Sequence, residues 1–484
     1  MFDLSERSLL AAQSYIDGAW VSADDGRTFA VTNPSTGETI AEVADCGVAE
    51  TKRAIAAAKR SQPAWAAKTA KERAQILRRW FELITEYTDD LGRLLTAEQG
   101  KPLAEAKGEI GYGASFIEWF AEEGKRIYGE TIPGHQPDKR LVVLRQPVGV
   151  VGAITPWNFP NAMITRKVGP ALAAGCSVVL KPAELTPLSA TALCVLAERA
   201  GVPAGILNVV TGLDAPGIGL ELCTNEAVGK ITFTGSTEVG RILMRQSAES
   251  IKKMSLELGG NAPFIVFDDA DLDAAVEGAI MCKFRNAGQT CVCANRIYVQ
   301  AGVYDAFAEK LAKAVEGLTV GDGFEEGSKI GPLIEPAALD KVEAHIADAK
   351  SKGGRVLLGG GRHAKGGLYF EPTLLTDVPA DALVSREETF GPVAPLIKFL
   401  EESEAVGLAN ATEFGLAAYF YARDLGRVWR VAEGLESGIV GINTGIISTE
   451  VAPFGGVKQS GLGREGSKHG IEEYLEMKYL CMSV

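Results

Sequence analysis

The chain contains two short segments whose residue types could do covalent chemistry. The segment Asn286-Ala287-Gly288-Gln289-Thr290-Cys291-Val292-Cys293 offers a thiol in a polar loop that contains glycine. Upstream, Glu257-Leu258-Gly259-Gly260 puts one carboxylate at the end of Lys253-Met254-Ser255-Leu256, a run that reads as a strand. A nucleophilic sulfur and a separate carboxylate suit a two-step reaction, in which a thioester forms and an activated water hydrolyses it. Neither segment alone would establish that chemistry.

The sequence predicts helices and strands that position these residues. After a short strand-like entry from Ser14 to Val21, the first third of the chain is rich in helical patterns. An amphipathic helix packed into the core is predicted by the spacing of Ile76, Leu77, Trp80, Phe81 and Ile84. The helical pattern continues from Glu105 to Ile127.

From residue 147 onward, strand-like and helix-like runs alternate. Strands are expected at Val148 to Thr155, Ser177 to Leu180, Ile206 to Val210 and Lys230 to Phe233. Helices are expected from Pro187, briefly after Val210, and from about Glu238. Such alternation indicates a parallel sheet covered by helices. A second α/β series runs from Phe264 to Asn443 with no low-complexity linker, so the expected fold class is α/β with tightly packed lobes.

Two segments belong to neither series. Lys139 to Pro147 is an extended run after a turn that contains Pro and Gly, and Tyr474 to Val484 ends the chain with a mixed apolar tail. If both are edge strands, each must be paired or protected.

Composition limits the class of protein. The 484 residues allow about three domains or one large multi-lobed unit, and a net charge of −13 argues against nucleic-acid binding. The N-terminus has early acids and no apolar core, and the run from Val168 to Leu180 is too short to span a bilayer, so a cytoplasmic protein is expected. Eight cysteines without disulfide-like spacing suit a reducing compartment. The one close pair, Cys291 and Cys293, has a CxC spacing that is not usual for zinc ligands, so no metal is expected.

The best candidate for a phosphate-binding turn is Phe233-Thr234-Gly235-Ser236-Thr237-Glu238-Val239-Gly240, which follows a strand and opens a helix. Backbone N–H groups at such a helix start can hold a pyrophosphate. The GxxxxG spacing hints at a nucleoside-triphosphate loop, but Arg241 and Ile242 stand where Lys and Ser or Thr are required. A literal GxGxxG between Gly461 and Gly466 follows no strand and leaves too little chain for a βαβ unit, so we discount it.

Taken together, these motifs resemble the aldehyde dehydrogenase superfamily from about Tyr15 to the C-terminus, and within it the succinate-semialdehyde and glutarate-semialdehyde dehydrogenases. The catalytic and ribose-binding motifs occur in the family's order. The resemblance implies a Rossmann-type cofactor domain, a second α/β catalytic domain and a small β element that makes a homotetramer or homodimer. We assign residues 1–127 and 148–257 to the cofactor domain, 258–460 to the catalytic domain, and 128–147 and 461–484 to oligomerisation.

The resemblance also implies a role for each site residue. Cys291 would attack the aldehyde, and its thiol needs a nearby cation or helix N-terminus because a free thiol is mostly protonated near pH 7. Asn158, in Pro156-Trp157-Asn158-Phe159-Pro160, and the backbone N–H of Cys291 would hold the oxyanion. Glu257 would activate water, so the expected product is a free acid rather than a coenzyme A thioester. The cofactor would contact Trp157, Lys181, Glu184, Gly235, Ser236, Leu258, Glu388 and Phe390.

Two of these residues bear on the choice of dinucleotide. A carboxylate at Glu184, near the adenosine ribose, accepts hydrogen bonds from ribose hydroxyls and repels a 2′-phosphate. Relatives that prefer NADP tend to carry a small residue such as serine there. NAD is therefore the expected cofactor, with NADP as the alternative because Lys181 could meet the phosphate.

Arg166, Arg285 and Ser448 resemble residues that clamp the distal carboxylate of the substrate in succinate-semialdehyde dehydrogenases. A guanidinium suits this task because its donors can bind both carboxylate oxygens. The expected reaction is oxidation of succinate semialdehyde to succinate. Glutarate semialdehyde is the alternative substrate, since one methylene is worth only about 1–3 kcal/mol of discrimination.

Three further interpretations stay open. Cys293 resembles a cysteine that in some relatives forms a disulfide with the nucleophile, which would make a reversible oxidative switch. A cysteine hydrolase would need a histidine base, and none of the four histidines lies in a recognisable nucleophile-partner motif. A catalytically inactive family member that serves as a structural or binding protein would be expected to have lost Cys291 or Glu257, and both are present.

Overall fold

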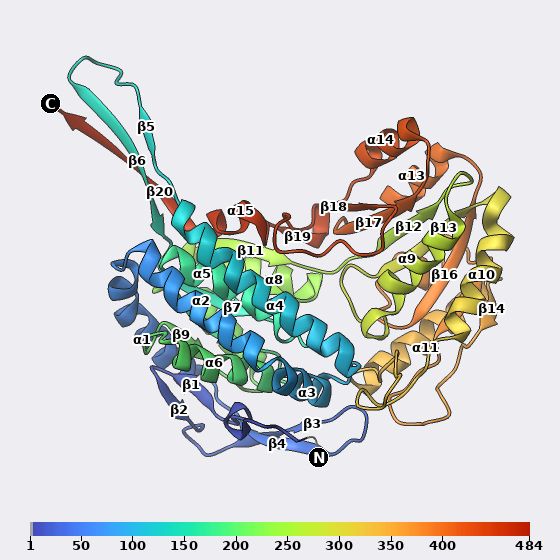
Figure 1. Ribbon diagram of the computed structural model, residues 1–484, viewed down its shortest axis with the longest axis horizontal. Helices are drawn as coiled ribbons and strands as arrows, with labels where there is room; N and C mark the ends of the chain where they lie inside the picture. Colours follow the sequence, from blue (N-terminus) through green and yellow to red (C-terminus); the bar gives the residue numbers. More distant parts are fainter. Residues whose placement is uncertain (1–2) are drawn as a thin grey trace.

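The computed structural model describes residues 3–484; Met1 and Phe2, which open the N-terminal segment considered above, lie outside the described residues. The chain forms two α/β lobes and a thin β arm that projects from the first lobe and ends at the C-terminus (Figure 1). No helix within residues 3–484 is long and apolar enough to cross a membrane.

The first lobe is built on a mixed sheet with the strand order β19-β11-β10-β7-β8-β9-β1-β2. Its parallel part consists of β7 (Val150–Ile154), β8 (Ser177–Lys181), β9 (Leu207–Val209), β10 (Val228–Thr234) and β11 (Lys253–Glu257). These strands have the Rossmann order, which reverses direction between β7 and β10. Ligands of such sheets bind at the carboxyl ends of the two strands where the order reverses.

Helices cover both faces of this sheet, as the alternation predicts. One face carries α5 (Ala162–Ala174) and α6 (Leu188–Ala200), covered in turn by α2 (Ala70–Glu86), α3 (Thr88–Gln99) and α4 (Leu103–Glu123). The other face carries α1 (Val48–Ala66), α7 (Ala215–Thr224) and α8 (Thr237–Ser247). The central strands are buried on both faces, which explains their nearly continuous apolar sequence.

The predicted amphipathic stripe is confirmed in α2. Leu77, Trp80 and Ile84 are fully buried in the core between α2 and the helices beneath it. Thr69 and Glu72 exchange hydrogen bonds at the start of the helix, a capping box that satisfies backbone N–H groups left free by the first turn.

The second lobe has its own sheet, with the strand order β14-β15-β16-β13-β12-β17-β18. Its strands are β12 (Ala262–Val266), β13 (Ala294–Gln300), β14 (Arg355–Leu358), β15 (Thr373–Thr376), β16 (Val393–Phe399), β17 (Ala417–Tyr421) and β18 (Ile439–Ile442). Its helices are α9 (Leu272–Phe284), α10 (Tyr304–Glu316), α11 (Pro336–Ser351), α12 (Leu383–Arg386), α13 (Glu402–Asn410) and α14 (Leu425–Gly434). The expected second α/β series is thus confirmed.

The two sheets meet edge to edge near the predicted catalytic residues. β11 ends at Glu257, and a short connection through Gly259 and Gly260 leads directly into β12. The loop that contains Cys291 precedes β13, the neighbour of β12. The carboxyl edge of the first sheet therefore lies against the amino edge of the second.

The arm is a sheet of β5 (Glu130–Ile132), β6 (Lys139–Pro147) and β20 (Leu475–Ser483), in the order β20-β6-β5. The expected extended segments are confirmed as strands, and they pair with each other from Leu475 opposite Pro147 to Ser483 opposite Lys139. Earlier in the last segment, β19 (Gly461–Leu462) joins the first sheet and α15 (Ser467–Gly470) follows it, so the GxGxxG there opens no βαβ unit. The division into domains stays a prediction.

The N-terminal region differs from the expectation. Ser14 to Val21 is not one strand but a hairpin of β1 (Ser14–Ile16) and β2 (Ala19–Val21), turned by Asp17 and Gly18 with positive φ values. A separate pair, β3 (Thr28–Thr32) and β4 (Thr39–Ala44), was not expected at all.

Candidate active site

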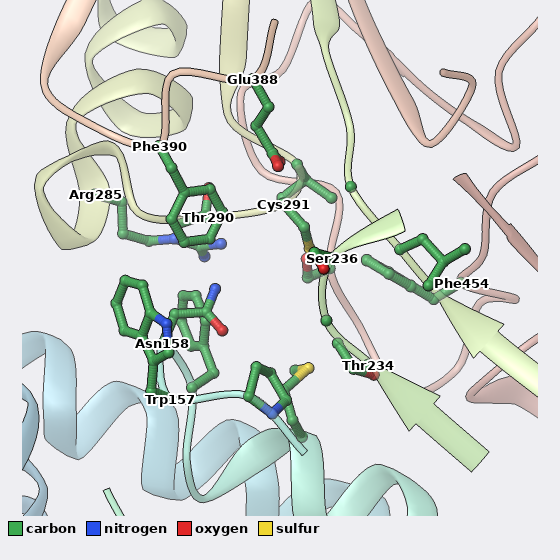
Figure 2. Close-up of a pocket in the computed structure, with 18 of the residues that line it drawn as sticks. Trp157, Asn158, Thr234, Ser236, Arg285, Thr290, Cys291, Glu388, Phe390 and Phe454 are labelled. Atoms are coloured by element: carbon green, nitrogen blue, oxygen red, sulfur yellow. The ribbon is translucent and has the colours of Figure 1, made fainter. Parts of the chain in front are cut away.

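A cavity at the strand-order reversal of the first sheet brings most of the predicted residues together. It has a volume of about 410 Å³ and lies between the ends of β7 and β10 and the loop before β13 (Figure 2). From the predicted set, its lining includes Trp157, Asn158, Arg166, Gly235, Ser236, Leu258, Arg285, Cys291, Glu388, Phe390 and Ser448. Glu257, Lys181, Glu184 and Cys293 are not part of the lining.

Cys291 lies at the cavity wall, on a loop with an unusual backbone. Asn286 and Ala287 adopt left-handed φ values of 52° and 54°, a conformation that costs residues other than glycine energy. The backbone N–H of Asn286 donates to the Glu105 carboxylate of α4 at 2.8 Å, which holds the loop in this shape. The half-buried Cys291 is therefore presented by a fixed turn.

The surroundings of the Cys291 thiol keep it neutral. Burial raises its pKa to about 12, the carboxylates of Glu388 and Glu257 add to the rise, and Arg166 and Arg285 oppose it. These side chains alone leave the thiol protonated at neutral pH. A further positive charge in the cavity would favour ionisation.

Asn158 follows β7, and both its side chain and its backbone form hydrogen bonds with the loop 286–293 that carries Cys291, which we call the nucleophile loop. Its Nδ2 donates to the carbonyl of Gln289 at 3.0 Å, and its own carbonyl accepts from Nδ2 of Asn286 at 3.1 Å. An amide carries two N–H groups, so this side-chain hydrogen bond uses one of them. Figure 2 shows Asn158 beside Trp157 at the cavity.

Glu257 is the last residue of β11 and is buried, and its Oε2 has no hydrogen-bond partner within the described residues. Burial raises its pKa well above the usual range, and the neighbouring Glu465 adds to the rise against the lowering effect of Arg166 and Lys167. Burial opposes ionisation of Glu465 as well, but ion pairs with Lys167 and Arg166 hold its pKa below the usual range. Glu257 is thus a buried carboxyl group whose surroundings favour its protonated form.

Arg166 and Arg285 reach the cavity from different elements. Arg166, on α5, is 2% exposed, has its Nε 2.7 Å from Oε2 of Glu465, and stacks on the ring of Phe454 at 4.1 Å from the centroid. Its Nη2 is buried without a hydrogen-bond partner among residues 3–484. Arg285 follows α9 and lies 5.3 Å from the ring centroid of Phe159. Two guanidiniums in one cavity suit an anionic ligand.

Other predicted residues frame the opposite part of the cavity. Ser236 caps α8, since its Oγ accepts from the backbone N–H of Val239 at 3.3 Å. The rings of Trp157 and Phe390 meet edge to face, with centroids 5.5 Å apart. Burial raises the pKa of Glu388 to about 7, although its carboxylate accepts from the N–H of Gly260 at 3.1 Å.

Lys181 and Glu184 lie outside the cavity lining and form an ion pair with each other. Nζ of Lys181 is 2.8 Å from Oε2 of Glu184, with the lysine buried and the glutamate side chain 41% exposed. Burial works against ionisation of Glu184, but Lys181 holds its pKa below the usual range. The positive charge of Lys181 is therefore already compensated.

Cys293 is buried, with its Sγ 3.3 Å from Nζ of Lys283. Cys291 and Cys293 are both free thiols, and a disulfide between them stays a prediction. No group of three or more His, Cys, Asp or Glu residues in the described part of the chain could hold a metal ion.

Comparison with known proteins identifies the family and the fold. Residues 20–480 match the model of the aldehyde dehydrogenase family. The chain belongs to that family. It is 67% identical over 479 residues to a glutarate-semialdehyde dehydrogenase of Pseudomonas aeruginosa, with 99% of each chain covered. It is also 67% identical over 481 residues to a succinate-semialdehyde dehydrogenase of Escherichia coli named for NADP, with 99% of this chain and 100% of the relative covered.

The solved structure of a succinate-semialdehyde dehydrogenase from Burkholderia pseudomallei has a TM-score of 0.99 against this chain, at 64% identity and with 100% of both chains covered. The expected α/β aldehyde dehydrogenase fold is therefore confirmed.

Several residues of this aldehyde dehydrogenase line the cavity without having been predicted. They are Tyr112, Pro156, Phe159, Met163, Thr234, Gly259, Thr290, Val292, Glu335, Lys341 and Phe454. Some are direct neighbours of predicted residues, so the quoted motifs could have revealed them. Tyr112 and Met163 lie inside helices and Lys341 lies inside α11, where no local pattern marks them.

Tyr112 is the most informative of these residues. Its hydroxyl is buried and completes no hydrogen bond of normal geometry within residues 3–484. Burial raises its pKa and Glu465 adds to the rise, whereas Arg166, Arg285 and Ser448 act to lower it. The two arginines, Ser448 and Tyr112 all line this cavity and all carry hydrogen-bond donors, and we call these four residues the donor cluster.

Proposed function

We propose that this aldehyde dehydrogenase oxidises succinate semialdehyde to succinate with NAD or NADP, through a thioester on Cys291. The proposal rests on one arrangement: the Cys291 thiol and the guanidiniums of Arg166 and Arg285 line the same cavity. An aldehyde with a carboxylate at its far end matches both features. The names of the Escherichia coli and Burkholderia pseudomallei relatives support this substrate class.

The first half of the reaction forms the thioester. The ionised Sγ of Cys291 attacks the carbonyl carbon, and the electron pair of the C=O bond moves to oxygen. The Asn158 amide and the backbone N–H of Cys291 donate hydrogen bonds to that oxyanion, and loss of one such donor typically costs about 10²–10³ in rate. Collapse of the oxyanion re-forms the C=O bond as hydride leaves this carbon, which yields the thioester; a bound oxidised nicotinamide would supply the hydride acceptor.

The second half releases the acid. Glu257 takes a proton from water, whose oxygen attacks the thioester carbon, and the C–S bond breaks to regenerate the Cys291 thiolate. Only the ionised form of Glu257 can act as this base. Its buried position and raised pKa support the role, because a base with an ordinary pKa would have little affinity for the proton.

The residues of the chain fit the nicotinamide end of a dinucleotide in this cavity. The N-terminus of α8 at Ser236 suits a phosphate, because backbone N–H groups and the helix dipole favour negative charge there. Glu388 can accept hydrogen bonds from ribose hydroxyls, and the rings of Trp157 and Phe390 offer an apolar wall.

The Lys181–Glu184 pair supports NAD as the preferred cofactor. With the charge of Lys181 already met by Glu184, a 2′-phosphate would face a carboxylate rather than a free ammonium. We expect Glu184→Ser to raise kcat/KM with NADP relative to NAD, measured as initial rates of reduced-nicotinamide absorbance. An unchanged ratio would remove Glu184 from the choice of cofactor.

The donor cluster supports a carboxylate-bearing substrate. Arg166 offers a buried, unpartnered Nη2, and Arg285, Ser448 and Tyr112 add donors around it. Unpaired buried donors are costly unless a ligand meets them. An acidic semialdehyde would satisfy them, whereas an uncharged aldehyde would leave them unpaired.

Glutarate semialdehyde is the second candidate substrate. A relative named for it is as similar to this chain as the Escherichia coli relative. The two substrates differ by one methylene, so the same donors could serve both with only modest discrimination.

The deciding experiment compares initial rates with succinate semialdehyde, glutarate semialdehyde and butanal, each with NAD and with NADP. We expect a large advantage of both acidic substrates over butanal, and Arg285→Met should reduce that advantage while changing the rate with butanal little. Equal rates with butanal would overturn the carboxylate site. Absence of turnover with every substrate would favour the alternative that this chain is a catalytically inactive member of the family.

We further propose that the enzyme is a cytoplasmic homotetramer or homodimer. Free thiols at all eight cysteines suit a reducing compartment. The arm supports assembly, because it exposes large apolar side chains that would be covered by a second copy.

A further inference from the structure

A buried ion pair at the start of α4 lies against the segment that carries Asn158. Nζ of Lys101 is 2.6 Å from Oε2 of Glu109, and both side chains are 1% exposed. Neither residue lines the cavity, and neither takes part in the proposed chemistry. A buried pair of this kind adds little stability compared with apolar residues of similar size, because both charges must lose their water.

Lys101 holds the backbone of the predicted oxyanion donor. Its Nζ donates to the carbonyl oxygen of Asn158 at 2.7 Å and lies 3.9 Å from the ring centroid of Phe159. The same carbonyl accepts from Asn286, in the nucleophile loop. The carbonyl of Asn158 thus accepts hydrogen bonds both from Lys101 and from Asn286 in the loop that carries Cys291.

Glu109 holds the other end of the same segment. Its Oε1 accepts from the backbone N–H groups of Asn161 at 2.9 Å and Ala162 at 3.2 Å, where α5 begins. The side chain of Asn161 makes no capping bond, so Glu109 supplies the cap of α5 from a different helix. α5 carries Arg166, so the pair fixes both the oxyanion segment and the start of the helix behind it.

We propose that Lys101 and Glu109 form a positioning pair that fixes Asn158 relative to Cys291. The proposal rests on the oxyanion role of Asn158 proposed above. Catalysis of this kind is sensitive to small displacements, since a misplacement of about 1 Å can cost roughly 10² in rate. Lys101 and Glu109 lie outside the cavity lining, so the proposed effect passes through Asn158 and the start of α5.

The test is a double-mutant cycle in the full-length enzyme, with Lys101→Met, Asn158→Ala and both together. The measured quantity is the rate of the first turnover, followed as the burst of reduced nicotinamide. We expect Asn158→Ala to cost about 10²–10³ and Lys101→Met about 10-fold in an otherwise unchanged chain. Lys101→Met should cost less than about 2-fold when Asn158 is already Ala, because residues that act as a unit are not additive.

A second readout separates positioning from general damage. Alkylation of Cys291 by iodoacetamide passes through no oxyanion, so its rate should be unchanged in Lys101→Met. The control is Glu98→Gln, which alters another buried carboxylate that caps a helix, at the N–H groups of Leu188 and Ser189. This variant should leave the first-turnover rate unchanged. If Lys101→Met does not fold, Lys101→Met with Glu109→Gln removes both charges and takes its place in the cycle.

Each outcome is decisive. Full additivity of Lys101→Met with Asn158→Ala, or a first-turnover rate unaffected by Lys101→Met, would overturn the positioning pair while leaving the role of Asn158 intact. An Asn158→Ala enzyme with a normal first turnover would overturn the proposed role of Asn158, and the positioning pair would fall with it.

Discussion

Glu257 must be ionised to act as a base, and both burial and neighbouring charges shift the pKa of its carboxyl group. Burial and Glu465 raise its pKa, and Arg166 and Lys167 lower it by less. A carboxyl group with a raised pKa stays protonated over a wider acidic range than free glutamic acid. The acidic limb of kcat should therefore lie well above the ordinary glutamate pKa, wherever hydrolysis limits turnover.

The first prediction concerns the two halves of the reaction. Glu257→Gln keeps the shape of the side chain but cannot accept a proton from water, so we expect steady-state turnover to fall by about 10²–10⁴. The first-turnover burst of reduced nicotinamide should remain, at one equivalent per active site. Stopped-flow absorbance checks both quantities. Cys291→Ala is the control and should lose the burst as well as the steady state.

The second prediction concerns Tyr112, whose hydroxyl lies in the donor cluster. Tyr112→Phe removes one neutral donor, worth about 0.5–1.5 kcal/mol, so KM for succinate semialdehyde should rise about 3- to 10-fold. KM for butanal should hardly change. The matched control is Met163→Leu, a nearly isosteric change at another lining residue, which should leave the ratio of the two KM values as it was. Equal effects of Tyr112→Phe on both substrates would contradict a polar role.

At the scale of elements, the connection between β11 and β12 brings two backbones together. A β-carbon added at Gly260 would clash with the backbone oxygen of Cys291. The clash is with main-chain atoms rather than with a flexible side chain, so relief requires the nucleophile loop to move. Glycine at this position is therefore a condition for the placement of the thiol.

The third prediction follows from that contact. We expect Gly260→Ala to cost about 1–3 kcal/mol in the free energy of unfolding and to lower kcat by roughly 10²-fold, because overpacking shifts the loop. Thermal denaturation and steady-state rates are the measurements. Gly108→Ala on α4 is the control: a β-carbon there has no neighbour within 4 Å, so activity should be unchanged. Normal activity of Gly260→Ala would show that the loop adapts.

Elements with a strong local signal were predictable, and contacts between elements were not. The strand at Lys139 to Pro147 and the helix after Pro187 could be predicted, because extended runs and helices that start at proline are specified by neighbouring residues in the sequence. The hairpin at Asp17 was misread as one strand although Asp-Gly is a turn signal, because each strand is only three residues long. Tyr112 and Lys101 were missed because their importance comes from packing against residues distant in sequence.

The same limit applies within the candidate site. Cys291 and Asn158 stand out because each lies in a compact motif, and both line the cavity. The sequence could not reveal that Lys181 and Glu184 neutralise each other, nor that Glu257 lies beside Glu465. Those properties depend on distances that only the folded chain defines.

At the scale of the whole molecule, the five parallel strands at the centre of each sheet follow the same order, but the two lobes use different edges of their sheets for the cavity. The second sheet also reverses its order, between β12 and β17. At the carboxyl ends of those strands, Asp269 accepts from the N–H groups of Arg423 and Asp424, and Arg427 pairs with Asp268 and Asp269. The second lobe instead contributes its amino edge, which carries Cys291. The cavity thus forms where the carboxyl edge of one sheet meets the amino edge of the other.

The arm projects away from the two lobes (Figure 1). β20 and β5 are both edges of its sheet, and unpaired edges invite pairing with another chain. Met477 and Tyr479 lie on one face of β20 and are 66% and 56% exposed. Apolar exposure of this extent on a projecting sheet is costly in water unless a partner covers it.

The last prediction is that this face of β20 holds the proposed assembly together. Light scattering of the wild-type protein should give at least twice the chain mass of 51.2 kDa. Met477→Lys with Tyr479→Lys should lower the measured mass, because two desolvated ammonium groups oppose burial of the face. The control, Leu425→Lys with Trp429→Lys, changes two side chains on α14 that are similarly exposed, 69% and 62%, and should leave the mass unchanged. A wild-type mass equal to one chain would overturn the proposed oligomer, and a mass unaffected by the β20 substitutions would assign its interface to another surface.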